Sequence, residues 1–184
     1  MARVTRGGAG RQAVSLAKDW GTPPKYVEAV KAALGGSIGL DPCSNPWSVV
    51  RAERSYSLPE QDGLLLPWDS PTIYVNPPYG VDKARGTSIR HWLARCAEAA
   101  AVRGCEVVAL VPVAPNTRHW KESVFPYARS ICFLGDTRLR FLERGQDVGA
   151  GAPMACAMVH WGENARRFAW ALEPHGAVLD ARRS

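Results

Sequence analysis

The sequence predicts an α/β fold built on an open, mostly parallel sheet with an antiparallel terminal hairpin. Strand-like runs alternate with helix-like runs along the chain, which is the order that parallel βαβ units produce. Residues 106–113 are almost continuously apolar, as is typical of a strand buried on both faces of a parallel sheet. Near the C-terminus, strand patterns at 137–142 and 153–160 are joined by a loop at 143–152, and we expect them to pair as the hairpin.

The N-terminal region divides into an arm and the start of a domain. Residues 1–18 are rich in Gly and Arg and have no apolar period, so we expect a flexible basic arm followed by a single domain at 19–184. Thr22 begins a helix, with its hydroxyl at the N-cap and prolines in the first turn. Helical apolar spacing then continues to Leu34, where two glycines end the helix.

The middle of the chain is short of regular structure. We expect a brief strand at 37–40 that ends at Asp41, and a buried strand at 72–75. Residues 42–71 between them are rich in Pro, Ser, Asp and Trp, with a short strand around 47–52. These 30 positions are too few for two further strands with their helices. The sheet is therefore expected to be trimmed between its first strand and the strand at 72–75.

The later elements follow from apolar periodicity and from capping residues. Ser88 begins an amphipathic helix that Gly104 ends. The other predicted elements are a charged loop at 81–86, a short helix from Asn116 or Thr117 to Ser123, a strand at 129–134, a helix at 164–172 and a short strand at 177–179.

Charge is distributed unevenly along the 184 residues, whose net charge is +6. Residues 1–18 carry four basic side chains and no acidic one, and 82–95 is also basic, whereas 19–81 is acidic. Basic segments on either side of an acidic middle favour a polyanion such as nucleic acid outside and a cation-containing ligand inside.

Composition also argues against several classes of protein. No apolar run approaches the roughly 20 residues of a membrane span, and the N-terminus lacks the apolar core of a secretory signal. The five cysteines form neither a CxxC pair nor a cluster with histidine. We therefore expect free thiols in the cytoplasm, with neither a disulfide framework nor a metal site.

The most informative motif is Asn76-Pro77-Pro78-Tyr79, which directly follows the predicted strand at 72–75. Ligands of open α/β sheets bind at the carboxyl ends of strands. Two prolines stiffen the turn and remove backbone donors, which leaves carbonyl acceptors beside the Asn76 amide. Such acceptors suit a planar group bearing an NH2, with Tyr79 stacked on its face. Holding both N–H bonds makes the nitrogen lone pair available as a nucleophile.

This motif resembles the catalytic motif of amino-group methyltransferases that use S-adenosylmethionine. Together with Trp20-Gly-Thr-Pro, Leu40-Asp-Pro-Cys and Gln61-Asp-Gly-Leu in that order, it resembles the compact, phage-associated DNA N6-adenine methyltransferase (Dam) family. The resemblance extends over 19–161. It implies a Rossmann-like class I methyltransferase fold and methylation of a flipped adenine in double-stranded DNA, with S-adenosylmethionine as cofactor.

The resemblance implies roles for residues on the cofactor side. Asp41 would accept a hydrogen bond from the cofactor's ammonium. Thr22 and Pro23 would close over its carboxylate at the helix N-terminus. Asp62 would lie near its adenine amino group. The loop after Asp41 departs from the usual Gly-x-Gly pattern, so we expect Ser44 or Asn45 to supply the missing contacts. Glu53 and Glu60 are the candidates for the ribose.

The substrate side is assigned in the same way. Asn76 and the Pro77 carbonyl would hold the target amine, and Tyr79 and Phe141 would enclose the base. Trp20 and Trp68 are expected near this site. The predicted DNA contacts are Lys83, Arg85 and Arg90 and the arm residues Arg3, Arg6 and Arg11 for phosphates, with Lys83, Arg85, Arg144 and Gln146 in two loops that read bases.

Several alternatives stay open at this level. The same motif suits cytosine N4 or a protein glutamine amide, and the missing Gly-x-Gly leaves room for a non-catalytic DNA-binding protein on a decayed scaffold. The sequence specifies neither a recognition site nor a biological role, whether phage DNA protection, restriction–modification or regulation. A monomer is the favoured oligomeric state.

Overall fold

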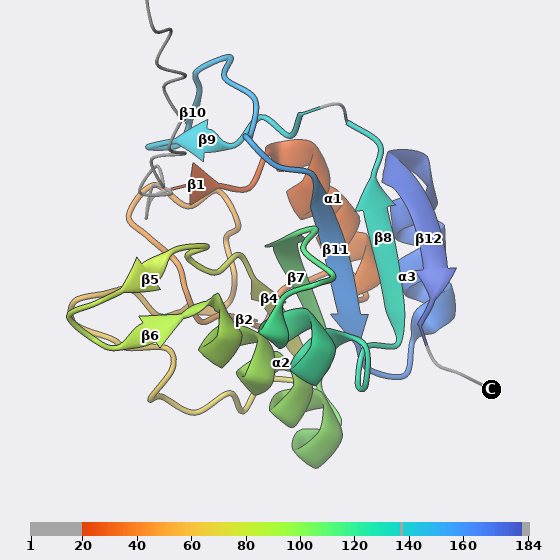
Figure 1. The fold of residues 1–184 in the computed structure, drawn as a ribbon, viewed down its shortest axis with the longest axis horizontal. Coiled ribbons are helices and arrows are strands. Elements are labelled where there is room, and N and C mark those ends of the chain that lie inside the picture. The colour runs from red at the N-terminus through yellow and green to blue at the C-terminus, as the bar shows by residue number, and fades with distance from the viewer. Residues whose placement is uncertain (1–19, 137, 182–184) are drawn as a thin grey trace, which may run out of the picture.

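The computed structural model describes residues 20–136 and 138–181. Its main element is a seven-stranded sheet (Figure 1). The predicted arm at 1–18 lies outside the described residues. The strands, in order across the sheet, are β12 (Gly176–Asp180), β8 (Ser130–Leu134), β11 (Cys156–Trp161), β7 (Glu106–Pro112), β4 (Thr72–Val75), β2 (Leu40–Asp41) and β3 (Arg54–Ser55).

The strand directions divide the sheet into a parallel and an antiparallel half. β3, β2, β4 and β7 run parallel to one another. β11 lies antiparallel between β7 and β8, and β12 is antiparallel to β8 at the edge. The α/β prediction is confirmed, but the sheet is mixed, with as many antiparallel as parallel strand pairs.

The prediction that 137–142 and 153–160 pair as a terminal hairpin is wrong. Residue 137 lies outside the described residues, 138–141 form no strand, and β11 pairs with β7 and β8 instead. Every residue of β11 is buried, so the strand is stabilised in the middle of the sheet, where both edges are paired and both faces are covered.

A small second sheet uses the residues just after the failed strand. Its central strand β9 (Leu142–Glu143) pairs antiparallel with β1 (Trp20–Gly21) and with β10 (Gln146–Asp147). The pairing with β1 brings the start of the described chain next to residues more than a hundred positions later. This sheet lies above the upper ends of the central strands in Figure 1.

Helices cover both faces of the main sheet. In Figure 1, α1 and α3 lie behind the sheet and α2 lies in front of it. The apolar residues divide into two core clusters, one on each face, and on the α2 side the indoles of Trp92, Trp120 and Trp161 are buried. The helical elements are α1 (Pro24–Ala33), α2 (Ile89–Arg103), the π-helical turn η1 (Trp120–Val124), α3 (Ala165–Leu172) and the short 3-10 turn η2 (Glu173–His175).

The helix ends test the capping predictions. α2 begins after Ser88 and ends at Gly104, whose φ of 67° is the left-handed conformation expected of a C-terminal glycine. For α1 the N-cap is Pro23 and not Thr22. The Thr22 hydroxyl is instead buried and lies 2.6 Å from the Tyr74 hydroxyl inside the protein.

The segment between β2 and β4 is as short of structure as its length indicated. Residues 42–71 contain β3 and no helix, and the strand expected around 47–52 is displaced to 54–55. Farther along, the expected loop at 81–86 is the turn of a hairpin between β5 (Val81–Asp82) and β6 (Thr87–Ser88).

An acid–histidine contact at the amino end of β7 joins this strand to β11 and to the residues just before α3. The Glu106 carboxylate lies 2.8 Å from Nε2 of the buried His160 and accepts hydrogen bonds from the Asn164 side chain (2.8 Å) and the Glu163 N–H (2.9 Å). Burial acts to raise the pKa of Glu106, but these hydrogen bonds outweigh it and lower the pKa to about 2.

We expect Glu106→Ala to lower the free energy of unfolding by about 3 kcal/mol, because it leaves buried donors without an acceptor. A depressed folded-state pKa stabilises the fold above the ordinary value of 4.5, and this contribution is lost as the pH falls towards 2. Denaturant unfolding should show that the difference in free energy of unfolding between Glu106→Ala and wild type is smaller at pH 3 than at pH 7. Glu60→Ala, at an exposed position, is the control, and equal midpoints for the two variants at pH 7 would contradict the assignment.

Candidate active site

Asp41 ends β2 and presents a carboxylate inside the protein. The residue is 4% exposed, and Oδ1 accepts a hydrogen bond from the Cys43 N–H at 3.2 Å. Burial raises the pKa of Asp41 to about 6, although the hydrogen bonds from Cys43 and from the Ser44 side chain act to lower it. Among the described residues, no basic side chain forms an ion pair with this carboxylate. The site therefore suits a ligand that carries a positive charge.

The segment Asn76-Pro77-Pro78-Tyr79 continues from β4, the parallel neighbour of β2. Leu40 is in register with Ile73, so Asp41 and Asn76 lie at the same carboxyl edge of the sheet. Asn76 donates a hydrogen bond from Nδ2 to the Trp20 carbonyl oxygen at 2.8 Å. Within the described part of the chain, no donor bonds to the carbonyl of the buried Pro77. The Asn76 Oδ1 atom and the Pro77 carbonyl oxygen are thus the two acceptor atoms at the end of β4.

The Tyr79 hydroxyl lies between two acceptors. Its oxygen is 3.3 Å from Asn76 Oδ1 and 3.2 Å from the carbonyl oxygen of Leu110, in β7. Burial raises the pKa of the Tyr79 phenol well above its usual value, so the hydroxyl keeps its proton and acts as a donor. The hydroxyl can donate its hydrogen bond to either oxygen, and when it donates to Leu110, Asn76 Oδ1 is able to accept from another donor.

Trp20 and Phe141 form an aromatic cluster with Tyr79 of the motif. Trp20 stacks on Phe141 with ring centroids 4.9 Å apart and planes 12° apart. Tyr79 meets both edge-on, at 6.2 Å from Trp20 and 5.8 Å from Phe141. The expectation that Trp20 lies near the motif is confirmed. Trp68 is fully buried, and its Nε1 donates to the Gly63 carbonyl, so it supports the Asp62 loop from inside the core.

The N-terminus of α1 offers fewer donors than expected. Pro24 has no N–H, and the N–H groups of Tyr26 and Val27 both donate to the Pro23 carbonyl. Only the Lys25 N–H of the first turn is left for a ligand. With the Thr22 hydroxyl paired to Tyr74, an anion here would depend on one backbone donor.

The loop that carries Asp62 packs directly on the end of β2. A side chain at Gly63 would collide with the Pro42 carbonyl, so only glycine allows this approach. Asp62 is paired with Arg85, which donates from Nε at 3.1 Å and from Nη2 at 2.6 Å. The structure thus brings together two residues that sequence reasoning assigned separately, to the cofactor and to DNA.

The other predicted loop residues lie around the site. Asn45 follows Ser44 in the turn after β2, and its Oδ1 accepts the Trp47 N–H at 2.9 Å. Arg144 is at the tip of the β9–β10 hairpin, where its guanidinium lies 5.6 Å from the Trp47 ring centroid. The hairpin and the loop after β2 are therefore in contact.

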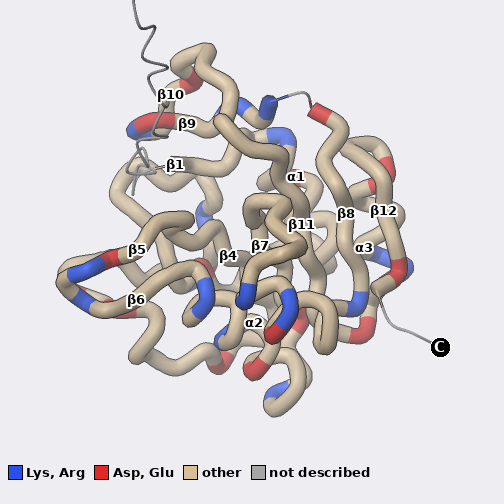
Figure 2. Tube along the Cα trace, in the orientation of Figure 1, with Lys and Arg blue, Asp and Glu red and all other residues tan. Residues whose placement is uncertain are grey.

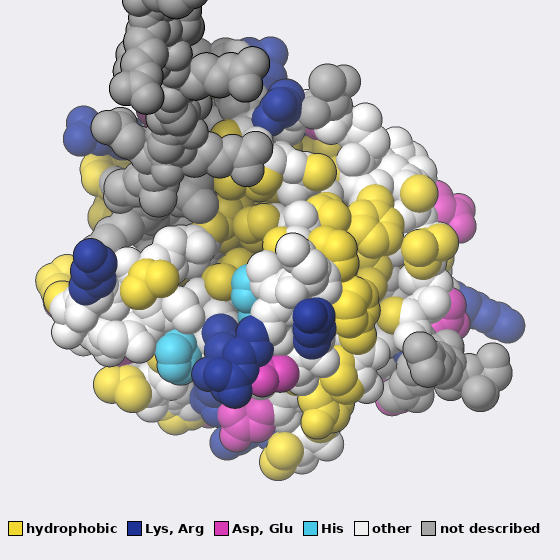
Figure 3. Space-filling model, in the orientation of Figure 1, with side chains coloured by type: hydrophobic (Ala, Val, Ile, Leu, Met, Phe, Trp, Pro, Cys, Tyr) yellow, Lys and Arg dark blue, Asp and Glu magenta, His cyan; other side chains and the backbone are white. Residues whose placement is uncertain are grey.

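Basic residues mark the outer ends of two hairpins. Lys83 in the β5–β6 turn and Arg144 in the β9–β10 turn are exposed, and both tips lie on the left side of Figure 2. No described acidic side chain pairs with either residue. Figure 3 shows further basic side chains on the face that carries α2. Arg90 of α2 and Arg118, just before η1, both pair with Glu122.

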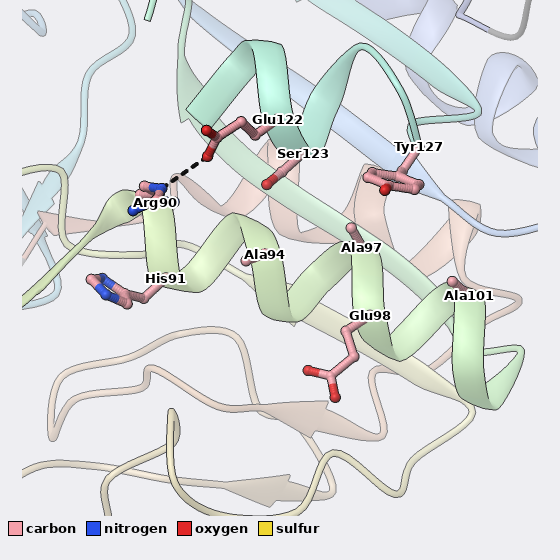
Figure 4. A pocket seen from close by; sticks show the side chains of 9 residues that line it. All are labelled: Arg90, His91, Ala94, Ala97, Glu98, Ala101, Glu122, Ser123 and Tyr127. Carbon is pink, nitrogen blue, oxygen red and sulfur yellow. Dashed lines mark hydrogen bonds and ion pairs between the residues drawn. The ribbon is translucent and has the colours of Figure 1, made fainter. Parts of the chain in front are cut away.

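A separate groove of 490 Å³ runs between α2 and the segment around η1 (Figure 4). It is lined by Arg90, His91 and small residues of α2 on one side and by Glu122, Ser123 and Tyr127 on the other. None of the predicted catalytic or cofactor residues lines it. Within the residues that the structure describes, no group of three or more His, Cys, Asp or Glu could hold a metal ion, and no helix has the length and apolar character to cross a membrane.

Sequence reasoning missed two backbone groups of this site. The carbonyls of Trp20 and Leu110 contact Asn76 and Tyr79, respectively. No local pattern marks a carbonyl as functional, and the contacts follow only from the pairing of β1 with β9 and of β4 with β7.

Comparison with known proteins gives one match. A family model described as DNA N-6-adenine-methyltransferase (Dam) matches residues 11–171, which is most of the chain. No curated protein and no solved structure matches the chain.

Proposed function

The chain belongs to the DNA N-6-adenine-methyltransferase (Dam) family, and from this premise we propose that it transfers a methyl group from S-adenosylmethionine to N6 of a flipped adenine in double-stranded DNA. Residues 19–184 would form one methyltransferase domain, with 1–18 as a basic arm. The observation that carries the proposal is a juxtaposition. One of two adjacent parallel strands ends in a buried carboxylate that has no basic partner among residues 20–136 and 138–181, and the other ends in a pair of hydrogen-bond acceptors.

The chemistry of Asp41 fits the proposed cofactor. A carboxylate whose pKa is raised by burial, with no basic partner among the described residues, gains from the approach of an ammonium or sulfonium group. Ser44 holds this carboxylate, and the close contact of Gly63 with Pro42 keeps the Asp62 loop beside it. The proposed cofactor site is completed by Asn45, Thr22 and Pro23. S-adenosylmethionine supplies an electrophilic methyl carbon on a sulfonium.

Asn76 and Pro77 would act on the amine. Asn76 Oδ1 and the Pro77 carbonyl are both acceptors, and each can take one N–H of an exocyclic amine. Withdrawing the two hydrogens from the ring plane makes the lone pair available, and the acceptors stabilise the positive charge that develops on nitrogen during transfer. Because both groups are fixed by the turn, the gain comes mainly from positioning.

Tyr79 and Phe141 would bind the base itself. The Tyr79 ring is anchored through its hydroxyl, which can donate its hydrogen bond to the Leu110 carbonyl alone when an amine occupies Asn76 Oδ1. Phe141, which is 3% exposed and stacked on Trp20, would support the Tyr79 ring from behind. A flipped base stacked on Tyr79 recovers part of the few kcal/mol that unstacking costs.

Double-stranded DNA would be bound at the two hairpins. Lys83 and Arg144 are the exposed cations at their tips, whereas Arg85 is held by Asp62. We propose that the protein acts in the cytoplasm, where its five cysteines would stay reduced and where DNA is accessible. We also propose that it is a monomer and that its reaction needs no metal.

Substitution of the β9–β10 hairpin should change site selection. Arg144→Ala with Gln146→Ala is expected to broaden the set of methylated sites more than it slows methylation at the best site, because each base contact contributes about 1–3 kcal/mol of discrimination. Methylome sequencing of DNA from cells expressing each variant measures this, with Arg90→Ala, at an exposed predicted phosphate contact outside the two loops, as the control. An unchanged set of sites with a uniformly lower rate would mean that the hairpin contacts only phosphates.

Mass spectrometry of nucleosides tests the proposed reaction. The protein is incubated with S-adenosylmethionine and unmethylated duplex DNA, which is then digested. We expect 6-methyladenine as the methylated product. Finding 4-methylcytosine would show that cytosine, and not adenine, is the base that is methylated. Methylation of a protein glutamine would remove DNA as the substrate, and DNA binding without measurable cofactor binding by calorimetry would indicate a decayed scaffold.

A further inference from the structure

The Asn76 side chain has a fixed orientation. Its Nδ2 lies 2.8 Å from the Trp20 carbonyl oxygen, and a carbonyl oxygen can only accept a hydrogen bond. The amide nitrogen must therefore face Trp20, and Oδ1 must face away from it, where it lies 3.3 Å from the Tyr79 hydroxyl. A freely rotating amide would present NH2 to the target amine half of the time, and two donors repel.

Trp20 is itself held by two independent sets of contacts. Its backbone belongs to β1, in register with Glu143 of β9. Its ring stacks on Phe141 at 4.9 Å and packs edge-on against Tyr79 at 6.2 Å. The carbonyl that receives the Asn76 amide is thus fixed from the backbone side and from the ring side.

We propose that Trp20 is a positioning residue for catalysis, whose carbonyl selects the one orientation of Asn76 that can accept the target amine. This inference rests on the proposed function of Asn76. It also links recognition to chemistry, because β9 leads directly into the Arg144 turn. DNA bound to that hairpin would contact the strand β9, whose partner β1 carries the Trp20 carbonyl that orients Asn76.

The variant Asn76→Asp gives a signature that a purely structural role would not. An ionised carboxylate cannot donate to the Trp20 carbonyl, and two acceptor oxygens repel at 2.8 Å. Only the protonated acid can donate to Trp20 and leave its other oxygen facing the amine. We expect kcat about a hundredfold below wild type at pH 8. The ratio of variant to wild-type kcat should rise about tenfold for each pH unit below that, until the acid is protonated.

Asn116→Asp is the matched control, since it adds the same charge at an exposed position on the same edge. Its ratio to wild type should stay flat with pH. A flat ratio for Asn76→Asp, or wild-type kcat at pH 8, would overturn the proposal.

Trp20 substitutions test the ring contacts. Trp20→Ala should lower kcat about tenfold and leave the dissociation constant for S-adenosylmethionine unchanged, whereas Trp20→Phe, which can still stack on Phe141, should recover most of kcat. Equal kcat for Trp20→Ala and wild type would overturn the proposal.

A measurement on the free protein separates this inference from the proposed function. In NMR spectra, the Asn76 side-chain NH2, assigned by its loss in Asn76→Asp, should exchange with solvent about tenfold more slowly than that of the exposed Asn116, and Trp20→Ala should accelerate it. Equally fast exchange for Asn76 and Asn116 refutes the Trp20 contact even if the enzyme is active. A wild-type protein that fails to methylate DNA refutes the proposed function, whatever the exchange rate.

Discussion

Asn76→Ala is expected to lower methyl transfer to DNA about a thousandfold while the dissociation constant for S-adenosylmethionine stays within about threefold of wild type. The substitution removes an acceptor aimed at the charge that develops on the amine, and the loss of one such preorganised group typically costs 10² to 10³ in rate. It leaves Asp41, at the end of the neighbouring strand, untouched. Single-turnover kinetics and calorimetry measure the two quantities on the same protein.

Asn116→Ala is the matched control for this substitution, since it removes an amide from an exposed position at the same edge. It should leave both quantities unchanged. Near wild-type turnover by Asn76→Ala would contradict the catalytic assignment, and equal losses in turnover and cofactor affinity would place Asn76 at the cofactor instead.

Asp41→Asn should produce the opposite pattern, with cofactor affinity about a hundredfold lower and a more stable free protein. An ionised Asp41 at pH 7 is a buried charge whose pKa is raised from 3.8 to about 6, which costs the fold on the order of 2–3 kcal/mol. Asparagine has a similar shape and can accept the Cys43 N–H without the charge. We expect a melting temperature about 5 °C above that of wild type at pH 7. A fall in melting temperature would contradict this account of Asp41.

The pH dependence of Asp41 has a definite sign. Because its folded-state pKa is raised, Asp41 favours the fold most below about pH 4, and this contribution is lost as the pH rises through 6. Cofactor binding needs the ionised form, so its affinity should be about tenfold weaker at pH 5 than at pH 7. Calorimetry of Asp41→Asn over the same range should show no such decline, and an equal decline would assign it to another group.

The central part of the site could be predicted because it is local in sequence. The β-branched and aromatic run at 72–75 forms β4 with the predicted bounds, and the motif follows it without a break. Asp41 likewise ends a short strand, and parallel strands bring their carboxyl ends to one edge. These positions depend on strand patterns and on the rule for parallel sheets.

The antiparallel half could not be predicted in the same way. The run at 153–160 reads as a strand, but the pattern does not say which neighbours it pairs with, and the nearest strand-like segment in sequence was the wrong partner. The β9–β10 turn was also hidden, because Arg144 occupies a left-handed conformation at φ 50° where Asn or Gly is usual. Its guanidinium over Trp47 is a tertiary contact that only the fold reveals.

The contacts that orient the site side chains span long stretches of sequence. Trp20 and Asn76 are 56 residues apart, and Asp62 and Arg85 are 23 apart. Sequence reasoning placed Arg85 on DNA and Asp62 on the cofactor from their types and neighbours alone. Their pairing depends on how the trimmed 42–71 segment folds back over β2, which its irregular composition does not encode in any periodic pattern.

The central claim is that neighbouring strand ends hold the cofactor at Asp41 and the target amine at Asn76. A crystal structure of the protein with S-adenosylhomocysteine and a DNA duplex tests it most directly. We predict the cofactor ammonium against the Asp41 carboxylate and the N6 of an extrahelical adenine about 3 Å from both Asn76 Oδ1 and the Pro77 carbonyl oxygen. A cofactor bound away from Asp41, or a target base whose amine contacts neither acceptor, would contradict the account.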